Sequence, residues 1–505
     1  MTLAGTRRFK GSPAHGARKQ TARARRVGRF AIGPWLWEGS PVHVQLPAEL
    51  RRILAETPEL RRAYLVGGCV RDSLLGLAVK DFDVEVFGVN YEQLEPALRR
   101  HGRTDLVGRS FGVVKLTTGS GIGYDFSIPR RDRKVAPGHT GFLVGFDPNI
   151  TPAEAAGRRD FTINALMFDP RAGEVLDFHG GKADLGNRVL RHTSAAFAED
   201  PLRVLRGMQF ASRFELTPAP ETVALCRSIA SSFGELAVER VGMEWFKWAA
   251  KSTVPSAGLK FLADAGWLGH FPEVDAMRGV PQESEWHPEG DVFIHTCHCC
   301  DALAKLPEWR AAPGDSRIAW MLAVLAHDFG KATTTHRAEK DGRLRIVSPG
   351  HDEAGVPLAE AFLARINAPN ALRERVPPLV KCHLAHLQTI TDRGVRRLAR
   401  RLAPETIEGL CVVITADCFG RPPQPCVVPE TVATLRAKAA ELELQNRSPR
   451  PILLGRHLIE HGMKPGPHFS EILEAAFEAQ LEGKFSELEG ATAWLRARER
   501  GVRRG

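Results

Sequence analysis

The chain has 505 residues and a net charge of +10, with 43% hydrophobic and 25% charged residues. This length exceeds what one hydrophobic core supports, so we expect three or four domains of ordinary globular composition. No apolar run is long enough to span a bilayer and no secretory signal pattern is present, which argues against a membrane or secreted protein. Nine cysteines without the spacing of a disulfide framework predict a reducing, cytoplasmic environment.

Positive charge is concentrated at the start of the chain. Residues 1–37 contain nine of the 69 Lys and Arg residues and no Asp or Glu, so the rest is nearly balanced, with 60 basic and 59 acidic residues. This composition predicts a disordered basic arm over residues 1–40. A nucleic-acid-binding tail is one interpretation. The alternatives are a non-functional extension, a mis-assigned start codon and an Arg-rich transit peptide.

Strands and helices are predicted to alternate over residues 41–190. The first helix is expected within 41–62, with one apolar face formed by Leu46, Leu50, Ile53 and Leu54. A strand in "AYLVGG" leads into a glycine turn and then into a short helix, "VRDSLLG", that ends at Gly76. Further strands are expected in "FDVEVFGV", "GVVKLTT", "YDFSI" and "EVLDF", and a further helix in "NYEQLEPALRRHG".

The remainder of the chain is predicted to be helical. Asp200-Pro201 marks a helix start, with Asp as N-cap and Pro in the first turn. The buried face of this helix is expected to include Leu202, Leu205, Met208 and Phe210. The breaker-rich "GRPPQP" predicts a linker at 420–425. The predicted fold class is therefore α+β, with a mixed-sheet domain followed by helical ones, in segments at 1–40, 41–190, 191–288, 289–420 and 430–505.

Two aspartates two positions apart, Asp81 and Asp83 in "KDFDVEVF", are the first candidate site. On a strand they share one face, and adjacent carboxylates repel each other unless a cation neutralises them. Mg²⁺ is held by such carboxylates together with substrate phosphates, and two ions can clamp an in-line nucleotidyl transfer. A Gly67-Gly68 turn suited to phosphate lies upstream, and Asp125 lies in a later strand. Alone, D-x-D is more often a solvated strand edge.

Taken together and in order, "YLVGGCVRD…KDFDVEVF", "GRRDFTINAL" and "AEDPLRVLRGMQFASRFEL" resemble the class II CCA-adding enzymes and bacterial poly(A) polymerases, members of the nucleotidyltransferase superfamily. The resemblance covers about residues 60–430. It implies a nucleotidyltransferase head followed by an all-helical neck and C-terminal region.

The resemblance also assigns residues. It implies that Asp81 and Asp83 hold the catalytic Mg²⁺ ions, with Asp125 as a third catalytic carboxylate. The structural alternatives are capping roles for Asp72 and Asp160. The nucleotide-binding residues implied are Gly67, Gly68, Arg71, Arg159, Asp160, Asn164, Asp200, Arg203 and Arg206.

"EDPLR" resembles the amino-acid template with which this family selects CTP and ATP. Asp200 offers acceptors for an exocyclic amine, which C and A both carry, and Arg203 offers donors to a ring nitrogen or carbonyl. Arg206 follows one turn later. Asp200 could instead serve only as a helix cap. The segment 130–142 resembles the flexible loop of enzymes that also add the terminal A.

A His-rich block forms a second constellation. His327-Asp328 resembles the HD phosphohydrolase motif, and His295 and Asp417 complete its ligand pattern. Imidazole with carboxylate suits a transition metal such as Ni, Mn or Co. His351 and His383 are candidates for extra ligands or phosphate contacts. Three cysteines near His298 could form a zinc site, but packing is the better interpretation for Cys297, Cys299 and Cys300.

The predicted function is a tRNA nucleotidyltransferase that adds or repairs the 3′-terminal CCA with CTP and ATP. Its partner would be the tRNA 3′ end, with no membrane partner and an open oligomeric state. The HD block implies 2′,3′-cyclic phosphodiesterase, 2′-nucleotidase and phosphatase activity. The alternatives are a poly(A) polymerase and an HD phosphohydrolase with a non-catalytic RNA-binding head.

Overall fold

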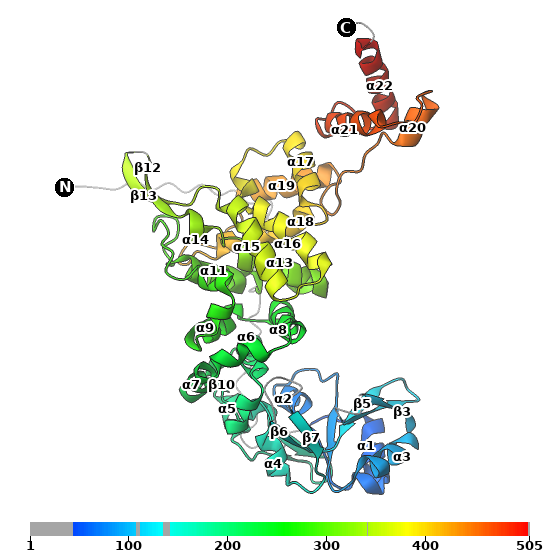
Figure 1. Ribbon diagram of the computed structural model, residues 1–505, viewed down its shortest axis with the longest axis vertical. Coiled ribbons are helices and arrows are strands. Elements are labelled where there is room, and N and C mark those ends of the chain that lie inside the picture. Colours follow the sequence, from blue (N-terminus) through cyan, green and yellow to red (C-terminus); the bar gives the residue numbers. More distant parts are fainter. Residues whose placement is uncertain (1–43, 108–111, 135–141, 341, 503–505) are drawn as a thin grey trace, which may run out of the picture. The chain divides into compact units, whose positions relative to one another are not determined.

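A seven-stranded mixed sheet forms the N-terminal part of the chain, drawn in blue and cyan in Figure 1. The computed structural model describes residues 44–107, 112–134, 142–340 and 342–502. The strand order is β3-β4-β5-β2-β1-β8-β9. Neighbours run antiparallel except for β2 and β5, which are parallel. The strands are β1 (Ala63–Val66), β2 (Asp83–Val86), β3 (Gly102–Val107), β4 (Val113–Thr118), β5 (Gly123–Ser127), β8 (Met167–Asp169) and β9 (Glu174–Leu176).

Local signals explain where the helices around this sheet begin. Asn90 and Gln93 form a capping box at the start of α3 (Tyr91–Arg99). Thr151 and Glu154 do the same for α4 (Pro152–Gly157). The apolar face of α3 is buried at Leu94, Ala97 and Leu98. The other elements of this part are α1 (Ala48–Glu56), α2 (Gly68–Leu74), α5 (Gly181–Gly186), the one-turn helices η1 (Pro58–Leu60) and η2 (Thr162–Asn164), and the hairpin strands β6 (Arg130–Lys134) and β7 (Phe142–Phe146).

The first helix is shorter than the 41–62 range that contains its apolar pattern. It begins after Pro47 and ends at Glu56, because Thr57 precedes Pro58 and is extended. Leu50, Ile53 and Leu54 are buried as predicted, and Leu46, outside the helix, is only half-buried.

Helices dominate from residue 195 onward. The predicted faces of α6 are buried, but its N-cap is Pro201 rather than Asp200. Two small sheets accompany the helices: β10 (Val189–Leu190) with β11 (Thr217–Pro218), and the hairpin β12 (His336–Lys340) with β13 (Arg343–Val347). The α+β class is confirmed, with the hairpin as an addition to the predicted helical block. The helices that follow η3 (Ala195–Glu199) up to the hairpin are α6 (Leu202–Phe214), α7 (Pro220–Ser228), α8 (Val238–Lys251), α9 (Pro255–Asp264), α10 (Pro272–Asp275), α11 (Val292–Leu303), α12 (Pro307–Ala311), α13 (Gly314–Ala326) and α14 (Lys331–Thr334), with the one-turn helices η4 (Ala230–Glu235) and η5 (Leu268–His270).

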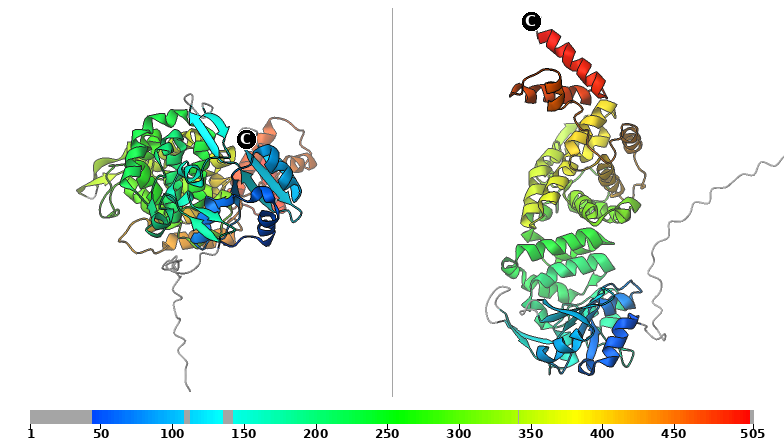
Figure 2. Two further views of the ribbon diagram at one scale, coloured as in Figure 1. Left: turned by 90° about the horizontal axis from the view of Figure 1, so that it is seen from below. Right: turned by 90° about the vertical axis from the view of Figure 1, so that its right-hand side faces the viewer.

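The helices after the hairpin build the His-rich block and the C-terminal region (Figures 1 and 2). Helices α11, α13, α16 and α18 pack on one another. Helix α18 is buried along nearly its whole length, which explains its continuous apolar sequence. The elements are α15 (His351–Arg365), α16 (Asn370–Cys382), η6 (His383–Leu387), α17 (Asp392–Leu402), α18 (Ile407–Phe419), α19 (Glu430–Glu441), α20 (Gly455–Glu460), α21 (His468–Leu481) and α22 (Leu488–Val502).

Residues 43–505 form one compact unit, so the predicted internal boundaries remain a prediction. The predicted linker at 420–425 lies in the irregular stretch between α18 and α19. Within the described residues, none of the helices combines the length and the apolar character needed to cross a bilayer. The basic arm and part of the 130–142 loop lie outside the described residues.

Candidate functional sites

The first site centres on the parallel pair of strands in the sheet. Asp83 is the first residue of β2 and stands opposite Asp125 of β5. Opposite residues on neighbouring strands share a face, so both carboxylates emerge on the same side of the sheet. Asp81 precedes the strand rather than lying in it, which corrects the prediction that both aspartates belong to one strand. The backbone N–H of Asp125 donates to the Phe82 carbonyl at 3.2 Å, which ties the segment between the aspartates to β5.

The electrostatics of Asp83 reflect crowding by like charge. Loss of solvation raises the pKa of Asp83, and the neighbouring Asp125 and Asp81 raise it further, against the opposing charge of Arg159. The side chain is exposed, so the carboxylate can reach a ligand from solvent. A divalent cation would relieve this repulsion, and an all-oxygen donor set of this kind suits Mg²⁺. The three carboxylates therefore fit the predicted ion.

Gly67 lies between β1 and α2 with φ +71°. A Cβ atom there would stand 3.0 Å from Nη1 of Arg159, so glycine keeps this guanidinium against the turn. Arg159 also pairs with Glu85 of β2 at 3.4 Å. The Gly67 N–H donates to the Leu166 carbonyl at 3.3 Å and is thus already engaged. The turn offers a ligand the positive charge of Arg159 rather than the N–H of Gly67.

A buried chain of polar groups connects α2 with α6. Arg71 donates to Asp72 and to Oδ1 of Asn164, Asn164 donates from Nδ2 to Asp160 at 2.9 Å, and Nε of Arg206 donates to the other oxygen of Asp160 at 2.7 Å. Burial disfavours the charged form of Asp160, but Arg206 and the hydrogen bonds of Asn164 and Phe161 outweigh it and lower the pKa of Asp160. Four predicted nucleotide-binding residues thus form one network.

The predicted base-selecting pair lies just before and within the first turn of α6. The carboxylate of Asp200 accepts from the Leu202 N–H at 3.2 Å and from Nη2 of Arg240 at 2.9 Å. The guanidinium of Arg203 donates to the carbonyls of Ala196 and Arg158, at 2.6 and 2.8 Å. The cap alternative is therefore partly realised in Asp200, although Pro201 is the N-cap itself. A base edge would have to compete with these partners.

The second site is a buried cluster in the His-rich block. Nε2 of His295 lies 3.2 Å from Oδ1 of Asp417 and 3.7 Å from Oδ2 of Asp328, and Nε2 of His327 lies 3.3 Å from the same oxygen of Asp328. The four predicted ligands therefore converge, although α11, α13 and α18 are distant in sequence. The ring Nδ1 of His327 is 2.7 Å from the Val324 carbonyl, which makes Nδ1 the donor and leaves Nε2 bare.

These residues fit a metal ion. Nε2 of His327 is buried and has no hydrogen-bond partner among the described residues. Nδ1 of His295 contacts Glu289 at 2.7 Å, the arrangement in which a carboxylate orients a metal-binding imidazole. Neighbouring cations hold the pKa values of Asp328 and Asp417 low in spite of burial. Imidazole nitrogens and carboxylates at this spacing match a transition-metal donor set.

Known proteins were compared with this chain. A family model described as the poly(A) polymerase head domain matches residues 63–191. A multifunctional CCA protein of Xanthomonas campestris pv. campestris is 37% identical over 430 residues, which cover 82% of this chain and 97% of that protein. A multifunctional CCA protein of Stenotrophomonas maltophilia is 39% identical over 373 residues, covering 71% and 86%. The chain belongs to the CCA-adding enzyme family.

Solved structures of CCA-adding enzymes share the fold. The enzyme of Bacillus stearothermophilus in complex with CTP matches with a TM-score of 0.60 and 21% identity, covering 91% of this chain and 100% of that one. The enzyme of Thermotoga maritima complexed with a tRNA matches with a TM-score of 0.54 and 19% identity, covering 88% and 95%.

Several residues around the HD cluster of this CCA-adding enzyme were missed by sequence reasoning. Glu289 contacts both His287 and His295, and Lys331 stands 2.7 Å from Asp328. Cys299 lies 3.3 Å from Nε2 of His295. Burial raises the pKa of Cys299 well above its usual range, so it stays a thiol, in keeping with the packing interpretation. The spacing of His295 and Cys299, one helical turn, was a signal for this contact.

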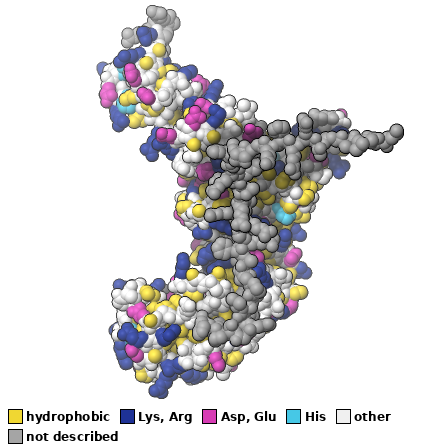
Figure 3. Space-filling view, turned by 180° about the vertical axis from the view of Figure 1, so that it is seen from behind, with side chains coloured by type: hydrophobic (Ala, Val, Ile, Leu, Met, Phe, Trp, Pro, Cys, Tyr) yellow, Lys and Arg dark blue, Asp and Glu magenta, His cyan; other side chains and the backbone are white. Residues whose placement is uncertain are grey.

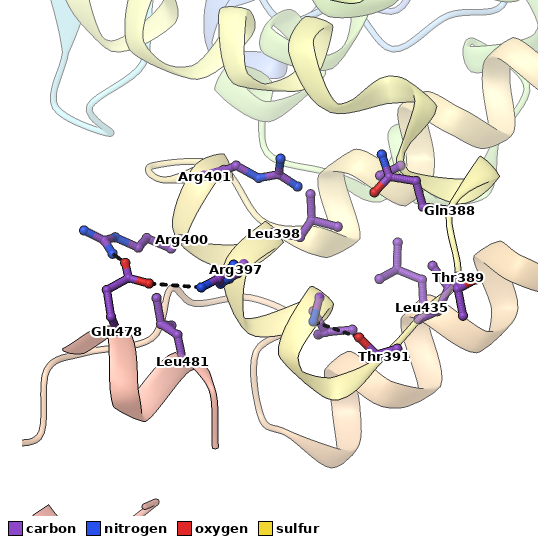
Figure 4. Close-up of a pocket in the computed structure, with 14 residues that line it drawn as sticks. Gln388, Thr389, Thr391, Arg397, Leu398, Arg400, Arg401, Leu435, Glu478 and Leu481 are labelled. Atoms are coloured by element: carbon purple, nitrogen blue, oxygen red, sulfur yellow. Dashed lines mark hydrogen bonds and ion pairs between the residues drawn. The ribbon is translucent and has the colours of Figure 1, made fainter. Parts of the chain in front are cut away.

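A cavity of about 690 Å³ lies away from both candidate sites, between η6, α17, α19 and α21. Figure 4 shows Arg397 and Arg400 of α17 beside Glu478 of α21 at one side of it. None of the residues that line this cavity belongs to either candidate site.

Proposed function

We propose that the protein adds or repairs the 3′-terminal CCA of tRNA with CTP and ATP. The observation that carries this is the pairing of Asp83 with Asp125 beside the Gly67 turn, in a chain that matches 97% of a multifunctional CCA protein. We also propose the cytoplasm as its compartment, which the nine free cysteines support.

The chemistry follows from the residues of the head. Asp81 and Asp83, with Asp125, would hold Mg²⁺, which when bound stabilises the charge that develops on the attacking and departing oxygens. Arg159, fixed by Glu85 and close to the Gly67 turn, presents positive charge to a triphosphate. The Arg71–Asn164–Asp160–Arg206 network holds this wall rigid beneath the nucleotide. Positioning is the main contribution that a protein makes to such a transfer.

Base selection is assigned to Asp200 and Arg203. For Asp200 to accept from an amine of cytosine or adenine, its pairing with Arg240 has to loosen. Arg203 donates to two carbonyls, which orients its guanidinium and limits its motion. We infer that nucleotide binding exchanges at least one of these internal bonds for a base edge.

A second proposed function belongs to the HD cluster, which would hydrolyse phosphoesters such as a 2′,3′-cyclic phosphate at a damaged tRNA end. The buried, unpartnered Nε2 of His327 is the observation that favours it. Ni²⁺, Mn²⁺ or Co²⁺ would be held by His295, His327, Asp328 and Asp417, and such an ion activates water and polarises a phosphoryl oxygen.

One incubation separates the possible functions. A tRNA that lacks CCA is supplied with each NTP alone and with CTP and ATP together. We expect C, C and A to be added in order. A long A tract formed from ATP alone would identify a poly(A) polymerase, and no incorporation with retained hydrolysis would identify an HD phosphohydrolase with an RNA-binding head.

The two proposed activities should separate in His327→Ala. Hydrolysis of 2′,3′-cyclic nucleotide should be lost while CCA addition is nearly unchanged. His386→Ala, which alters a buried histidine beside the cluster, is the matched control. Hydrolysis that survives in His327→Ala contradicts the HD proposal, and loss of CCA addition in it contradicts independent sites.

A further inference from the structure

The HD cluster contains more ligand atoms than one ion needs. One group consists of His295, Cys299, His327 and Asp417, and a separate group of Asp328, His351 and His383. Within each group the ligand atoms all lie within 4.8 Å of one another, and all seven residues are buried. Asp328 faces both groups: its Oδ2 is 3.3 Å from Nε2 of His327, and its Oδ1 is 3.4 Å from Nε2 of His351.

The second group has an unresolved repulsion. Nδ1 of His351 lies 2.7 Å from the Ser348 carbonyl, and Nδ1 of His383 lies 2.7 Å from the Val380 carbonyl. A carbonyl accepts only, so each Nδ1 carries the proton and each neutral ring has a bare Nε2. These two Nε2 atoms are 3.2 Å apart. Two lone pairs facing each other at that distance require a cation between them.

We propose that the HD cluster binds two divalent transition-metal ions, with Asp328 as the bridging carboxylate and with His351 and His383 holding the second ion. This rests on the proposed HD phosphohydrolase function and deepens it. An ion about 2.1 Å from both imidazole nitrogens and nitrogens 3.2 Å apart give an angle of roughly 100° at the ion. That angle is normal for tetrahedral or octahedral coordination.

The bridge gives the pair a chemical purpose. Carboxylate-bridged ions about 3.5–4 Å apart stabilise both the attacking and the departing oxygen at a phosphoester. The imidazole rings of both groups are oriented in the same way, because His327, His351 and His383 each use Nδ1 on the carbonyl three residues before them. Their Nε2 atoms are therefore positioned before any ion arrives. The expected substrates are phosphomonoesters and cyclic phosphodiesters.

The test counts ions in the full-length chain carrying Asp81→Ala and Asp83→Ala, so that the head contributes none. After chelation, the protein is titrated with Mn²⁺, and bound metal is measured by mass spectrometry and electron paramagnetic resonance. We expect two ions per chain and a spin-coupled manganese spectrum. His351→Gln or His383→Gln should reduce the count to one and remove the coupling. His386→Gln is the matched control and should keep two.

Each outcome decides between the proposals. One ion per chain that is unaffected by the His351 and His383 substitutions overturns the second site and leaves the HD function standing. No bound ion in the chelated and titrated protein overturns the HD function itself. If both histidine variants fail to fold, the unsubstituted histidines still provide the answer, because an uncoupled six-line manganese signal at saturation contradicts the bridged pair.

Discussion

Asp83 and Asp125 face each other across β2 and β5, the parallel pair among the described strands of the head sheet. This register brings two carboxylates that are 42 positions apart in sequence to the same face, with Asp81 near them. Loss of solvation and these two neighbours raise the pKa of Asp83. The relationship identifies Asp125 as a partner in ion binding that the D-x-D pattern does not contain.

Removal of either opposed carboxylate should abolish nucleotide incorporation. Asp83→Ala and Asp125→Ala should each lower the rate by about 100-fold or more, because charge stabilisation by a catalytic ion amounts to several kcal/mol. Single-nucleotide addition to a tRNA lacking CCA measures this, with cyclic phosphate hydrolysis as a check on folding. Asp105→Ala, a carboxylate of β3 in the same sheet, should keep full activity. Incorporation above about one per cent in Asp125→Ala would refute its role as an ion ligand.

Base discrimination should depend on Asp200 and Arg203. Asp200→Ala should reduce the preference for CTP and ATP over UTP and GTP by roughly 1–3 kcal/mol, the range for one good bidentate contact. Arg240→Ala is the matched control, since it removes the internal partner of Asp200 and leaves the carboxylate. Relative kcat/KM values for the four nucleotides report the effect. An equal loss for all four nucleotides would show that Asp200 only supports the start of α6.

Acid should weaken the head through Asp160. Its folded-state pKa lies below the usual value, so its ionised form stabilises the fold above the unfolded-state pKa of about 4 and that contribution disappears as the pH falls through the folded-state pKa. Asp160→Asn should cost roughly 1–3 kcal/mol at pH 7, the range for a lost charged hydrogen bond. Urea unfolding from pH 7 to pH 3 should show the variant and the original chain converging in acid. A pH-independent difference would contradict the assignment.

Helices α17 and α21 are joined by a row of ion pairs. Arg393 pairs with Glu482 at 3.2 Å, Arg397 with Glu478 at 3.3 Å, and Arg400 with Glu474 at 2.6 Å. Figure 3 shows basic and acidic side chains intermixed over part of the visible face. These pairs are partly exposed, so salt should screen them.

Glu478→Gln should therefore loosen α21 only slightly. We expect the opening free energy of residues 468–481 to fall by less than about 1 kcal/mol at low salt, and by less still at high salt. Hydrogen exchange followed by mass spectrometry measures this opening. Glu471→Gln, on the same helix, is the control. A loss that persists unchanged in high salt would mean that packing, rather than charge, holds this contact.

Local sequence was sufficient for the elements that frame the head. The strand–glycine–helix order of β1, Gly67 and α2, the strands β4 and β5, and the buried face of α6 follow from apolar periodicity and turn residues, which act over a few positions. The same reasoning placed the ends of α1 and β2 incorrectly. Thr57-Pro58 ends α1 early, and β2 starts at Asp83 because only from there does the segment pair with its neighbours.

Motif resemblance named the ligands of both sites, but only the tertiary structure decided how they meet. The parallel register of β2 and β5, the network from Arg71 through Asn164, and the facing imidazoles of His351 and His383 join residues from 32 to 93 positions apart. Sequence patterns report the preferences of neighbours along the chain. Contacts at these separations depend instead on how whole strands and helices pack, and this packing also brought Glu289 and Cys299 to the HD cluster.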